Sequence, residues 1–207
     1  MVLKGLYAIT DPLLTPYESD IILLKVETVL KAGAKIIQLR DKNNDDEFLL
    51  PIAKKLKKLC ESYQAIFIVN DRIDLAIKCD AHGVHLGKDD FSFKEARQLL
   101  KEKIIGVSCY GDLERAKLAE SLGANYVAFG SFFPSPTKPE AKLVKKEVLS
   151  EAKKVLKVPV CAIGGITLER AKELINLGAD MIAVISDLWK AKDLFGRAKA
   201  YVELFKS

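Results

Sequence analysis

Two cationic side chains follow one short apolar run of the sequence. Arg40 and Lys42 lie two positions apart directly after residues 35–39, and side chains two apart in an extended chain point to the same side. An arginine fork beside a lysine point charge suits a group with several negative charges, such as a diphosphate. The alternative is a surface ion pair with Asp41 or Asp45.

Carboxylates follow two further apolar runs. Asp71 comes shortly after residues 65–69, and Asp90 comes shortly after residues 83–86. Two carboxylates completed by phosphate oxygens and water form the open oxygen site that Mg²⁺ prefers. Each aspartate taken alone is equally typical of a helix cap.

Glycines and a hydroxyl side chain stand near the end of the chain. Gly164 and Gly165 separate an apolar run from a helical segment, and Ser186 follows the last apolar run. Glycine lets the backbone approach a ligand closely, and the first turn of a helix offers unpaired N–H groups to an anion. The pattern predicts a phosphate site; the alternative is a tight turn without a ligand.

The segment 131–146 carries three prolines and no apolar period, which predicts a long loop. Loops of this length in compact proteins are typically functional lids or disordered segments. Thr137 and Lys138 lie within it and suit an anionic substrate, whereas the alternative is a solvated surface loop.

General bases are scarce among these clusters. His82 and His85 are the only histidines, and Val84 and Leu86 flank His85, which favours a hydrogen-bonded core histidine. The sequence offers no convincing Ser–His–Asp or Cys–His site. Charge without a base fits chemistry in which a phosphate leaves once its charge is neutralised.

A repeating unit positions these residues: a short apolar run, a turn and an amphipathic segment. The runs are continuous in apolar character, which is typical of strands covered on both faces. The expected strands span residues 6–10, 35–39, 65–69, 83–86, 104–108, 126–130, 159–163 and 181–185. The expected helices span residues 21–32, 48–62, 73–78, 93–101, 113–122, 148–156, 168–177 and 194–205, with N-caps at Asp112 and Thr167 and closing glycines at Gly33, Gly123 and Gly178.

Eight alternating βα units predict an α/β fold, a single-domain (β/α)8 TIM barrel spanning residues 1–207. A doubly wound open sheet is the competing fold, but the first expected strand lacks the GxGxxG that such a sheet typically carries. Most of the clusters described above follow expected strands. In a barrel these residues meet at the carboxyl end, where such folds hold their active sites.

Composition excludes several other classes. The 207 residues are 49% hydrophobic and 29% charged, with a formal net charge of +5, as in ordinary globular proteins. No apolar run approaches the roughly 20 residues of a membrane helix, and the N-terminus lacks a signal-peptide pattern. The run KKLKK at 54–58 fits the wet side of a helix better than a nucleic-acid site. Four scattered cysteines indicate a reduced, cytoplasmic chain without a zinc site.

Eight short strings, taken in order, are similar to those of the thiamine phosphate synthase (thiamine-phosphate pyrophosphorylase) family. They are YAITD at 7–11, QLRDK at 38–42, VND at 69–71, GVHLG at 83–87, GVS at 106–108, SPTK at 135–138, AIGGI at 162–166 and AVIS at 183–186. Each string is weakly specific, but together they span nearly the whole chain. The resemblance implies a Mg²⁺-dependent transferase that condenses 4-amino-2-methyl-5-pyrimidinylmethyl diphosphate with a thiazole phosphate, yielding thiamine phosphate and pyrophosphate.

The resemblance also implies a role for each matching residue. The pyrimidine diphosphate would be held by Gln38, Arg40, Lys42, Asn70, Ser108 and Lys138, of which Arg40, Lys42, Ser108 and Lys138 form the expected catalytic group. Mg²⁺ would be held by Asp71 and Asp90. The thiazole phosphate would be held by Ser135, Thr137, Gly165, Ile185 and Ser186.

Four residues depart from the family pattern: Lys88, Tyr110, Ser131 and Ser135. Lys88 lies two residues before Asp90 and would compete with Mg²⁺ for that carboxylate. Two alternatives stay open. One is a thiazole tautomerase of the sister family, whose proposed base is a histidine where Tyr110 stands, and the other is a non-catalytic thiamine phosphate-binding protein. We expect small-molecule partners rather than nucleic acid or membrane, and a homo-oligomer is compatible with the sequence.

Overall fold

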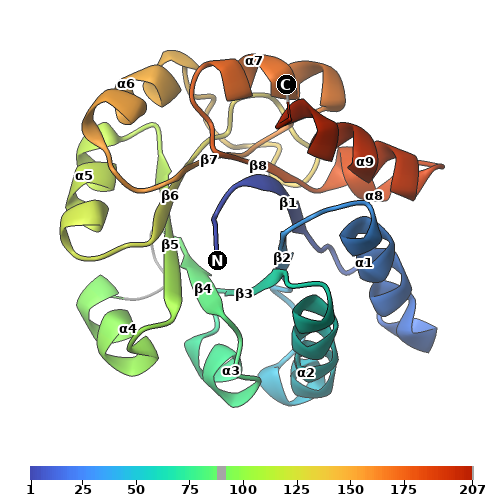
Figure 1. Cartoon of the computed structure of the whole chain (residues 1–207). Helices are drawn as coiled ribbons and strands as arrows, with labels where there is room; N and C mark the ends of the chain where they lie inside the picture. Colours follow the sequence, from blue (N-terminus) through green and yellow to red (C-terminus); the bar gives the residue numbers. More distant parts are fainter. Residues whose placement is uncertain (88–91, 207) are drawn as a thin grey trace.

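The computed structural model describes residues 1–87 and 92–206 of the chain. Within them, eight parallel strands pair in sequence order, and β8 pairs with β1 to close the ring (Figure 1). The strands are β1 (Gly5–Ile9), β2 (Ile36–Leu39), β3 (Ile66–Asn70), β4 (Gly83–Leu86), β5 (Ile104–Tyr110), β6 (Tyr126–Phe129), β7 (Val160–Ala162) and β8 (Met181–Val184). The predicted (β/α)8 barrel is confirmed.

Helices surround the ring on its outer side (Figure 1). They are the short 3-10 helix η1 (Glu18–Asp20) and the α-helices α1 (Ile21–Lys31), α2 (Asp46–Ser62), α3 (Ile73–Lys78), α4 (Phe93–Leu100), α5 (Leu113–Ser121), α6 (Glu147–Val155), α7 (Leu168–Asn176), α8 (Ser186–Trp189) and α9 (Leu194–Leu204). In the part of the chain that the structure describes, no helix combines the length and apolar character needed to cross a membrane.

Two apolar layers hold the barrel together. Side chains alternate along each strand, so Tyr7 and Ile9 face the barrel interior while Leu6 and Ala8 pack beneath the helices. The interior layer is completed by Ile36, Ile66, Ile68, Tyr126, Ala128, Cys161, Met181 and Ala183. Both faces of every strand are therefore covered, which explains the continuous apolar runs of the sequence.

The expected element boundaries agree with the structure to within two residues. β4 and α3 coincide with their predicted ranges, whereas β5 continues to Tyr110 because its pairing with β6 shifts between Ser108 and Tyr110. Tyr110 has a positive φ of 57° and lines the mouth of the barrel. Apolar periodicity does not reveal such an irregularity, nor does it reveal the short helices η1 and α8.

Both predicted residues occupy the N-cap position of their helices, but only one of them makes a capping hydrogen bond. The Asp112 carboxylate accepts a hydrogen bond from the Arg115 N–H, as expected. Thr167 precedes α7, but its side chain makes no capping hydrogen bond; the Leu168 N–H is instead 3.2 Å from the Asp187 carboxylate. A cap supplied by a residue distant in sequence cannot be recognised from local spacing.

The predicted closing glycines are confirmed. Gly33, Gly123 and Gly178 have φ values of +113°, +99° and +118°, in the left-handed region that glycine enters without steric cost.

A buried carboxylate organises the loop between β2 and α2. Asp41 is 5% exposed; its carboxylate accepts hydrogen bonds from the Tyr17 hydroxyl and the Asn44 amide at 2.7 Å each. Arg72, which follows β3, donates to the Asp41 carbonyl oxygen at 2.8 Å and to Asp46 at 2.7 Å. These contacts join the loops after β1, β2 and β3 into one unit, and they replace the expected alternative of an Asp41–Lys42 surface pair.

We expect the free energy of unfolding to depend on pH in the acid range because of this unit. Burial raises the pKa of Asp41, but the hydrogen bonds from Tyr17, Asn44 and Asn43 outweigh it and lower the value from 3.8 to about 2. A lowered folded-state pKa stabilises the protein above about pH 4, and that contribution of about 2 kcal/mol is lost as the pH falls toward 2. In urea unfolding between pH 2 and 5, the free energy of unfolding of Asp41→Asn should fall less steeply with decreasing pH than that of the wild type. An identical dependence on pH in the two proteins would contradict this account.

A second prediction concerns packing inside the barrel. Gly106 lies in β5, and a Cβ at this position would overlap the Tyr126 ring. We expect Gly106→Ala to lower the free energy of unfolding by about 3 kcal/mol, because an overfilled core forces its neighbours to shift. Gly123→Ala is the control: its Cβ would meet open space, so only the positive φ opposes it, at about 1 kcal/mol. If urea unfolding shows equal decreases in the free energy of unfolding for the two variants, the Tyr126 ring can shift without cost and the prediction is wrong.

Candidate functional site

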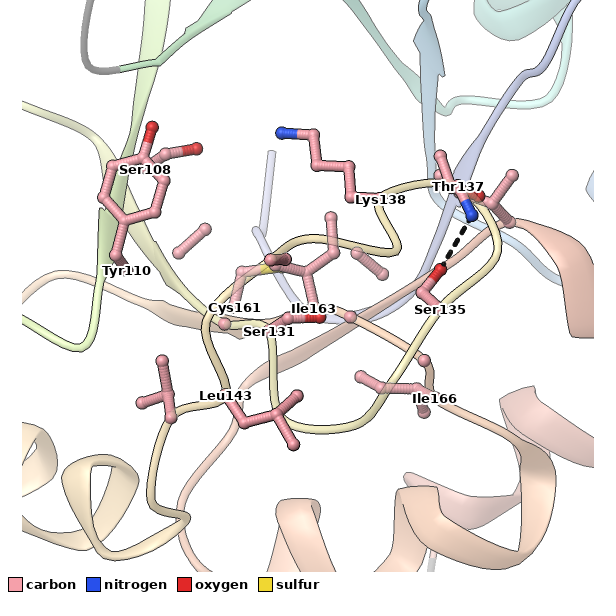
Figure 2. Close-up of a pocket in the computed structure, with 18 of the residues that line it drawn as sticks. Ser108, Tyr110, Ser131, Ser135, Thr137, Lys138, Leu143, Cys161, Ile163 and Ile166 are labelled. Atoms are coloured by element: carbon pink, nitrogen blue, oxygen red, sulfur yellow. Dashed lines mark hydrogen bonds between the residues drawn. The ribbon is translucent and has the colours of Figure 1, made fainter.

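A cavity of about 1230 Å³ opens at the carboxyl ends of the strands. Its lining includes residues from all eight strands, and the loop 131–146 forms one wall (Figure 2). This volume exceeds the roughly 300–1000 Å³ of a typical pocket for one small ligand. The cavity therefore has room for two small reactants.

Five polar side chains of the barrel interior form one hydrogen-bonded chain at the base of the cavity. Gln38 Nε2 donates to the Tyr7 hydroxyl at 2.7 Å, and the Tyr7 and Tyr126 hydroxyls are 2.7 Å apart. The Tyr126 hydroxyl is 2.8 Å from His85 Nδ1, and His85 Nε2 is 2.7 Å from Ser108 Oγ. Four of the five, Tyr7, Gln38, His85 and Ser108, line the cavity. The expected hydrogen-bonded core histidine at His85 is confirmed.

Sequence reasoning did not assign Tyr7 and Tyr126 to the site, because an aromatic residue in an apolar strand is typical of a core. The available signal was the residue type, since a buried tyrosine hydroxyl needs a partner that phenylalanine does not. Burial raises the pKa of both tyrosines far above the usual range. Their hydroxyls therefore carry protons at all physiological pH values.

A cationic side of the cavity lies at the ends of β2 and β3. Arg40 and Asn70 line it, and the Arg40 backbone N–H donates to the Thr10 hydroxyl at 3.1 Å. The sequence predicted that the Arg40 side chain points to the mouth of the barrel, and its presence among the residues that line the cavity supports this prediction. Below it, the unit built on Asp41 and Arg72 fixes the loop from which Arg40 and Lys42 project.

Lys42 and Asp71 meet beside this cationic side and form an ion pair. The Lys42 side chain is 50% exposed and the Asp71 side chain 21% exposed, so neither charge is locked in the interior. The Asp71 backbone has a φ of +66°, and its N–H donates to the His85 carbonyl oxygen at 2.9 Å. The sequence had suggested Asp41 or Asp45 as surface partners of this lysine; the structure gives Asp71 instead.

The predicted Mg²⁺ ligands are only partly described by the structure. Asp71 directly follows Asn70, which lines the cavity. It offers carboxylate oxygens, the hard donors that Mg²⁺ takes one or two at a time alongside substrate phosphates. Asp90 and Lys88 lie outside the described residues. Within residues 1–87 and 92–206 no three His, Cys, Asp or Glu side chains gather as a ready-made cage. Of the two predicted ligands, Asp71 is therefore the one whose position is described, and its carboxylate is a donor of the type that Mg²⁺ prefers.

A second group of predicted residues lines another side of the cavity. Gly165, Ile185 and Ser186 follow β7 and β8; β1 separates these two strands from β2 and β3 on one side of the ring, and β4, β5 and β6 separate them on the other. Gly165 has a φ of +63°, and a Cβ there would overlap the carbonyl oxygens of Phe133 and Pro134. Glycine is therefore required here for close packing of the loop 131–146, a role that the sequence alone did not separate from ligand binding.

The loop 131–146 is anchored at its two ends. The Phe133 ring lies 4.6 Å from the Arg170 guanidinium and 5.2 Å from the Lys146 ammonium, and the Val144 N–H donates to the Ser131 carbonyl oxygen at 2.8 Å. These attractions hold the loop over the barrel mouth. The predicted absence of regular structure between 131 and 146 is confirmed.

Lys138 extends from the tip of this loop. In Figure 2 its ammonium end is directed toward the side of the cavity that carries Ser108 and Tyr110. On the same loop, the Thr137 N–H donates a hydrogen bond to Ser135 Oγ at 3.2 Å, so the two hydroxyl residues belong to one turn (Figure 2). The loop thus brings a cation to one half of the cavity and hydroxyls to the other.

The cavity gathers most of the predicted site residues. Those that line it are Gln38, Arg40, Asn70, Ser108, Ser135, Thr137, Lys138, Gly165, Ile185 and Ser186. Lys42 and Asp71 are joined to each other beside it. Arg72, Arg170 and Phe133, which position the loops, were not recognised from the sequence because their partners are distant along the chain.

Comparisons with known proteins agree with this arrangement. Residues 6–188 match the family described as thiamine monophosphate synthase. The thiamine-phosphate synthase of Wolinella succinogenes is 48% identical over 191 residues, which cover 91% of this chain and 87% of that protein. The thiamine-phosphate synthase of Nitrosococcus oceani is 46% identical and covers 99% of this chain and 94% of its own length.

Solved structures give the same result. The thiamine phosphate pyrophosphorylase of Pyrococcus furiosus superposes with a TM-score of 0.89 at 37% identity, covering 98% of this chain and 95% of that one. A KDPGal structure shares the fold alone, with a TM-score of 0.74 at 18% identity. Identity of this extent along nearly the whole length places the chain: it belongs to the thiamine monophosphate synthase family.

Proposed function

We propose that the chain is a thiamine-phosphate synthase, a transferase that joins 4-amino-2-methyl-5-pyrimidinylmethyl diphosphate to a thiazole phosphate and releases pyrophosphate. The observation that carries this proposal is a single cavity lined by cationic residues at β2 and β3 and, at separate strands of the ring, by the glycine and hydroxyl residues at β7 and β8. Two anionic reactants need two such sides. A cavity of about 1230 Å³ gives them room to meet.

The pyrimidine diphosphate would occupy the cationic side. Arg40 and Lys138 bring positive charge from two directions to the departing diphosphate, and Lys42 adds a third charge at the rim. Preorganised charges of this kind stabilise a leaving anion without reorganisation at the moment of reaction. Gln38, Asn70 and Ser108 supply neutral hydrogen bonds around the same substrate.

Mg²⁺ belongs to the same half of the proposed site. When bound to Asp71 and Asp90 it would neutralise part of the charge on the departing pyrophosphate. The Lys42 ammonium balances the Asp71 carboxylate in the structure described here. Because that lysine side chain is half exposed, it can exchange its carboxylate partner for a phosphate oxygen.

The thiazole phosphate would lie across the cavity. Ser135 and Thr137 offer hydroxyls from the loop 131–146, and Gly165, Ile185 and Ser186 complete the pocket from β7 and β8. This placement agrees with the phosphate site that (β/α)8 barrels form with their last two βα loops.

The bond changes require no general base. The bond between the pyrimidinylmethyl carbon and the diphosphate oxygen breaks, and its electron pair leaves with pyrophosphate. The lone pair of the thiazole nitrogen then forms the new C–N bond. That nitrogen carries no proton to remove. This agrees with the cavity, in which both ring nitrogens of His85 are hydrogen-bonded to Tyr126 and Ser108.

The two alternatives fit the cavity less well. A thiazole tautomerase moves a proton and needs a base over the thiazole, but Tyr110 stands where the sister family has its histidine. A protein that only binds thiamine phosphate has no use for the cationic residues Arg40, Lys42 and Lys138 opposite the phosphate pocket. Both alternatives predict no pyrophosphate release.

The remaining parts of the proposal concern the setting of the reaction. The described cysteines are free and buried, which supports a reducing compartment such as the cytoplasm. A homo-oligomer is compatible with the proposed reaction.

We expect Arg40→Ala to lower turnover at least about a hundredfold, because a preorganised charge partner of the leaving group is lost. Purified protein would be incubated with both substrates and Mg²⁺ while pyrophosphate and thiamine phosphate are followed together. Lys58→Ala, on the exposed outer face of α2, is the matched loss of one cation and should retain wild-type turnover. Near-normal turnover in Arg40→Ala would show that Arg40 does not stabilise the leaving diphosphate.

Metal removal gives an independent test. Pyrophosphate release should stop in excess chelator and return when Mg²⁺ is restored, and Asp71→Ala should lower turnover at least about a hundredfold. Far-ultraviolet circular dichroism checks that the variant is folded. Undiminished release in chelator would remove Mg²⁺ from the proposal, and release of no pyrophosphate by wild-type protein under any condition would favour one of the alternatives.

A further inference from the structure

The five-residue chain at the base of the barrel has a direction. Each neutral member can pass on one hydrogen, so fixing the hydrogen at one end fixes it at every link. Gln38 Nε2 donates to the Tyr7 hydroxyl; the Tyr7 hydrogen is then left for the Tyr126 oxygen, and the Tyr126 hydrogen is left for His85 Nδ1.

The same reasoning continues to the far end. When His85 Nδ1 accepts a hydrogen bond, the neutral imidazole carries its hydrogen on Nε2. That hydrogen points to Ser108 Oγ, 2.7 Å away. The Ser108 hydroxyl hydrogen is then left to point into the cavity. At the opposite end, the Gln38 amide keeps its Oε1 as an acceptor.

We propose that Tyr7, Tyr126 and His85 are positioning residues that fix the hydrogen-bond polarity of the cavity, so that Ser108 donates to the substrate and Gln38 accepts from it. This inference rests on the proposed function for the identity of the substrate. It adds three residues, Tyr7, Tyr126 and His85, that act on the substrate through Gln38 and Ser108.

The proposed polarity matches a pyrimidine diphosphate at both ends. A diphosphate has only acceptor oxygens, and an aminopyrimidine carries an amino group that donates. If the chain ran the other way, Ser108 would turn its lone pairs toward an anion and Gln38 would present N–H groups to an amino group. Both contacts would be repulsive.

Burial makes the direction hard to scramble. Tyr126 is fully buried, Tyr7 is 1% exposed and Gln38 is 2% exposed. Reversing a single link would leave a buried hydroxyl without a partner, which costs roughly 1–3 kcal/mol. The chain must therefore reverse as a whole or keep its direction.

Nitrogen NMR of the imidazole rings tests this direction without any substrate. The protein has two histidines, His82 and His85, which give two sets of signals. His82 is an internal standard: its Nδ1 accepts the Phe67 N–H at 2.8 Å, and burial lowers its pKa, so it is the neutral Nε2–H tautomer. We expect ¹⁵N-labelled protein at pH 7.5 to show the same tautomer at His85. A neutral Nδ1–H ring or an imidazolium at His85 would overturn the proposed polarity.

The Tyr126→Phe variant tests whether this direction reaches the substrate. Removing the hydroxyl takes away the hydrogen-bond partner that fixes the tautomer at His85 Nδ1, so the His85 nitrogen signals should shift toward a mixture of tautomers while those of His82 stay in place. The KM for the pyrimidine diphosphate should rise about tenfold, and the KM for the thiazole phosphate should change less than twofold. Tyr63→Phe is the matched control: its hydroxyl binds Glu27 at 2.8 Å outside the cavity lining, and it should move neither readout.

Further outcomes separate the inference from the proposed function. Equal rises in the two KM values, or unshifted His85 signals in Tyr126→Phe, would overturn the positioning role. If Tyr126→Phe does not fold, Tyr7→Phe breaks the same chain one link earlier and carries the same expectations. Wild-type protein with the expected His85 tautomer but no pyrophosphate release would refute the synthase assignment and, with it, the substrate match on which the positioning role depends.

Discussion

The hydrogen bond between the Tyr7 and Tyr126 hydroxyls joins strands from two sides of the ring. These residues lie in β1 and β6, and both side chains are almost fully buried. A buried hydroxyl must have a partner, so the interior of the barrel tolerates this pair only as part of the chain that ends at Gln38 and Ser108. The requirement for satisfied polar groups therefore places hydrogen-bonding side chains at the base of the cavity.

The same requirement shapes the rim. The loops after β1, β2 and β3 converge on the Asp41 carboxylate and the Arg72 guanidinium, each of which satisfies several partners. Arg40 and Lys42 flank Asp41 in the sequence, so a rigid loop at that residue fixes where both cations leave the backbone. The opposite wall is held by a different force, the attraction of Arg170 and Lys146 to the Phe133 ring.

The sequence predicted the barrel well because its signal is local. Short apolar runs, glycine at helix ends and the cap at Asp112 depend on neighbours within one turn or one strand, and the structure confirms them. The errors share a physical cause. The Leu168 cap comes from Asp187, and the Lys42 partner is Asp71. Tyr7 finds its partner in Tyr126, 119 positions away. Such pairs exist only after the ring closes, so local spacing cannot reveal them.

An ion pair compensates the charge of one cationic residue of the proposed site, Lys42. The Asp71 carboxylate balances Lys42, and both side chains keep contact with water, so the pair gains little and is easily exchanged. A multiply charged diphosphate offers these cations a stronger partner than a single carboxylate does. The closed ring is shared with barrels of 18% identity and does not specify chemistry. In the proposed function, the chemistry depends on this exchangeable set of charges and on the proposed direction of the hydrogen bonds at the base of the cavity.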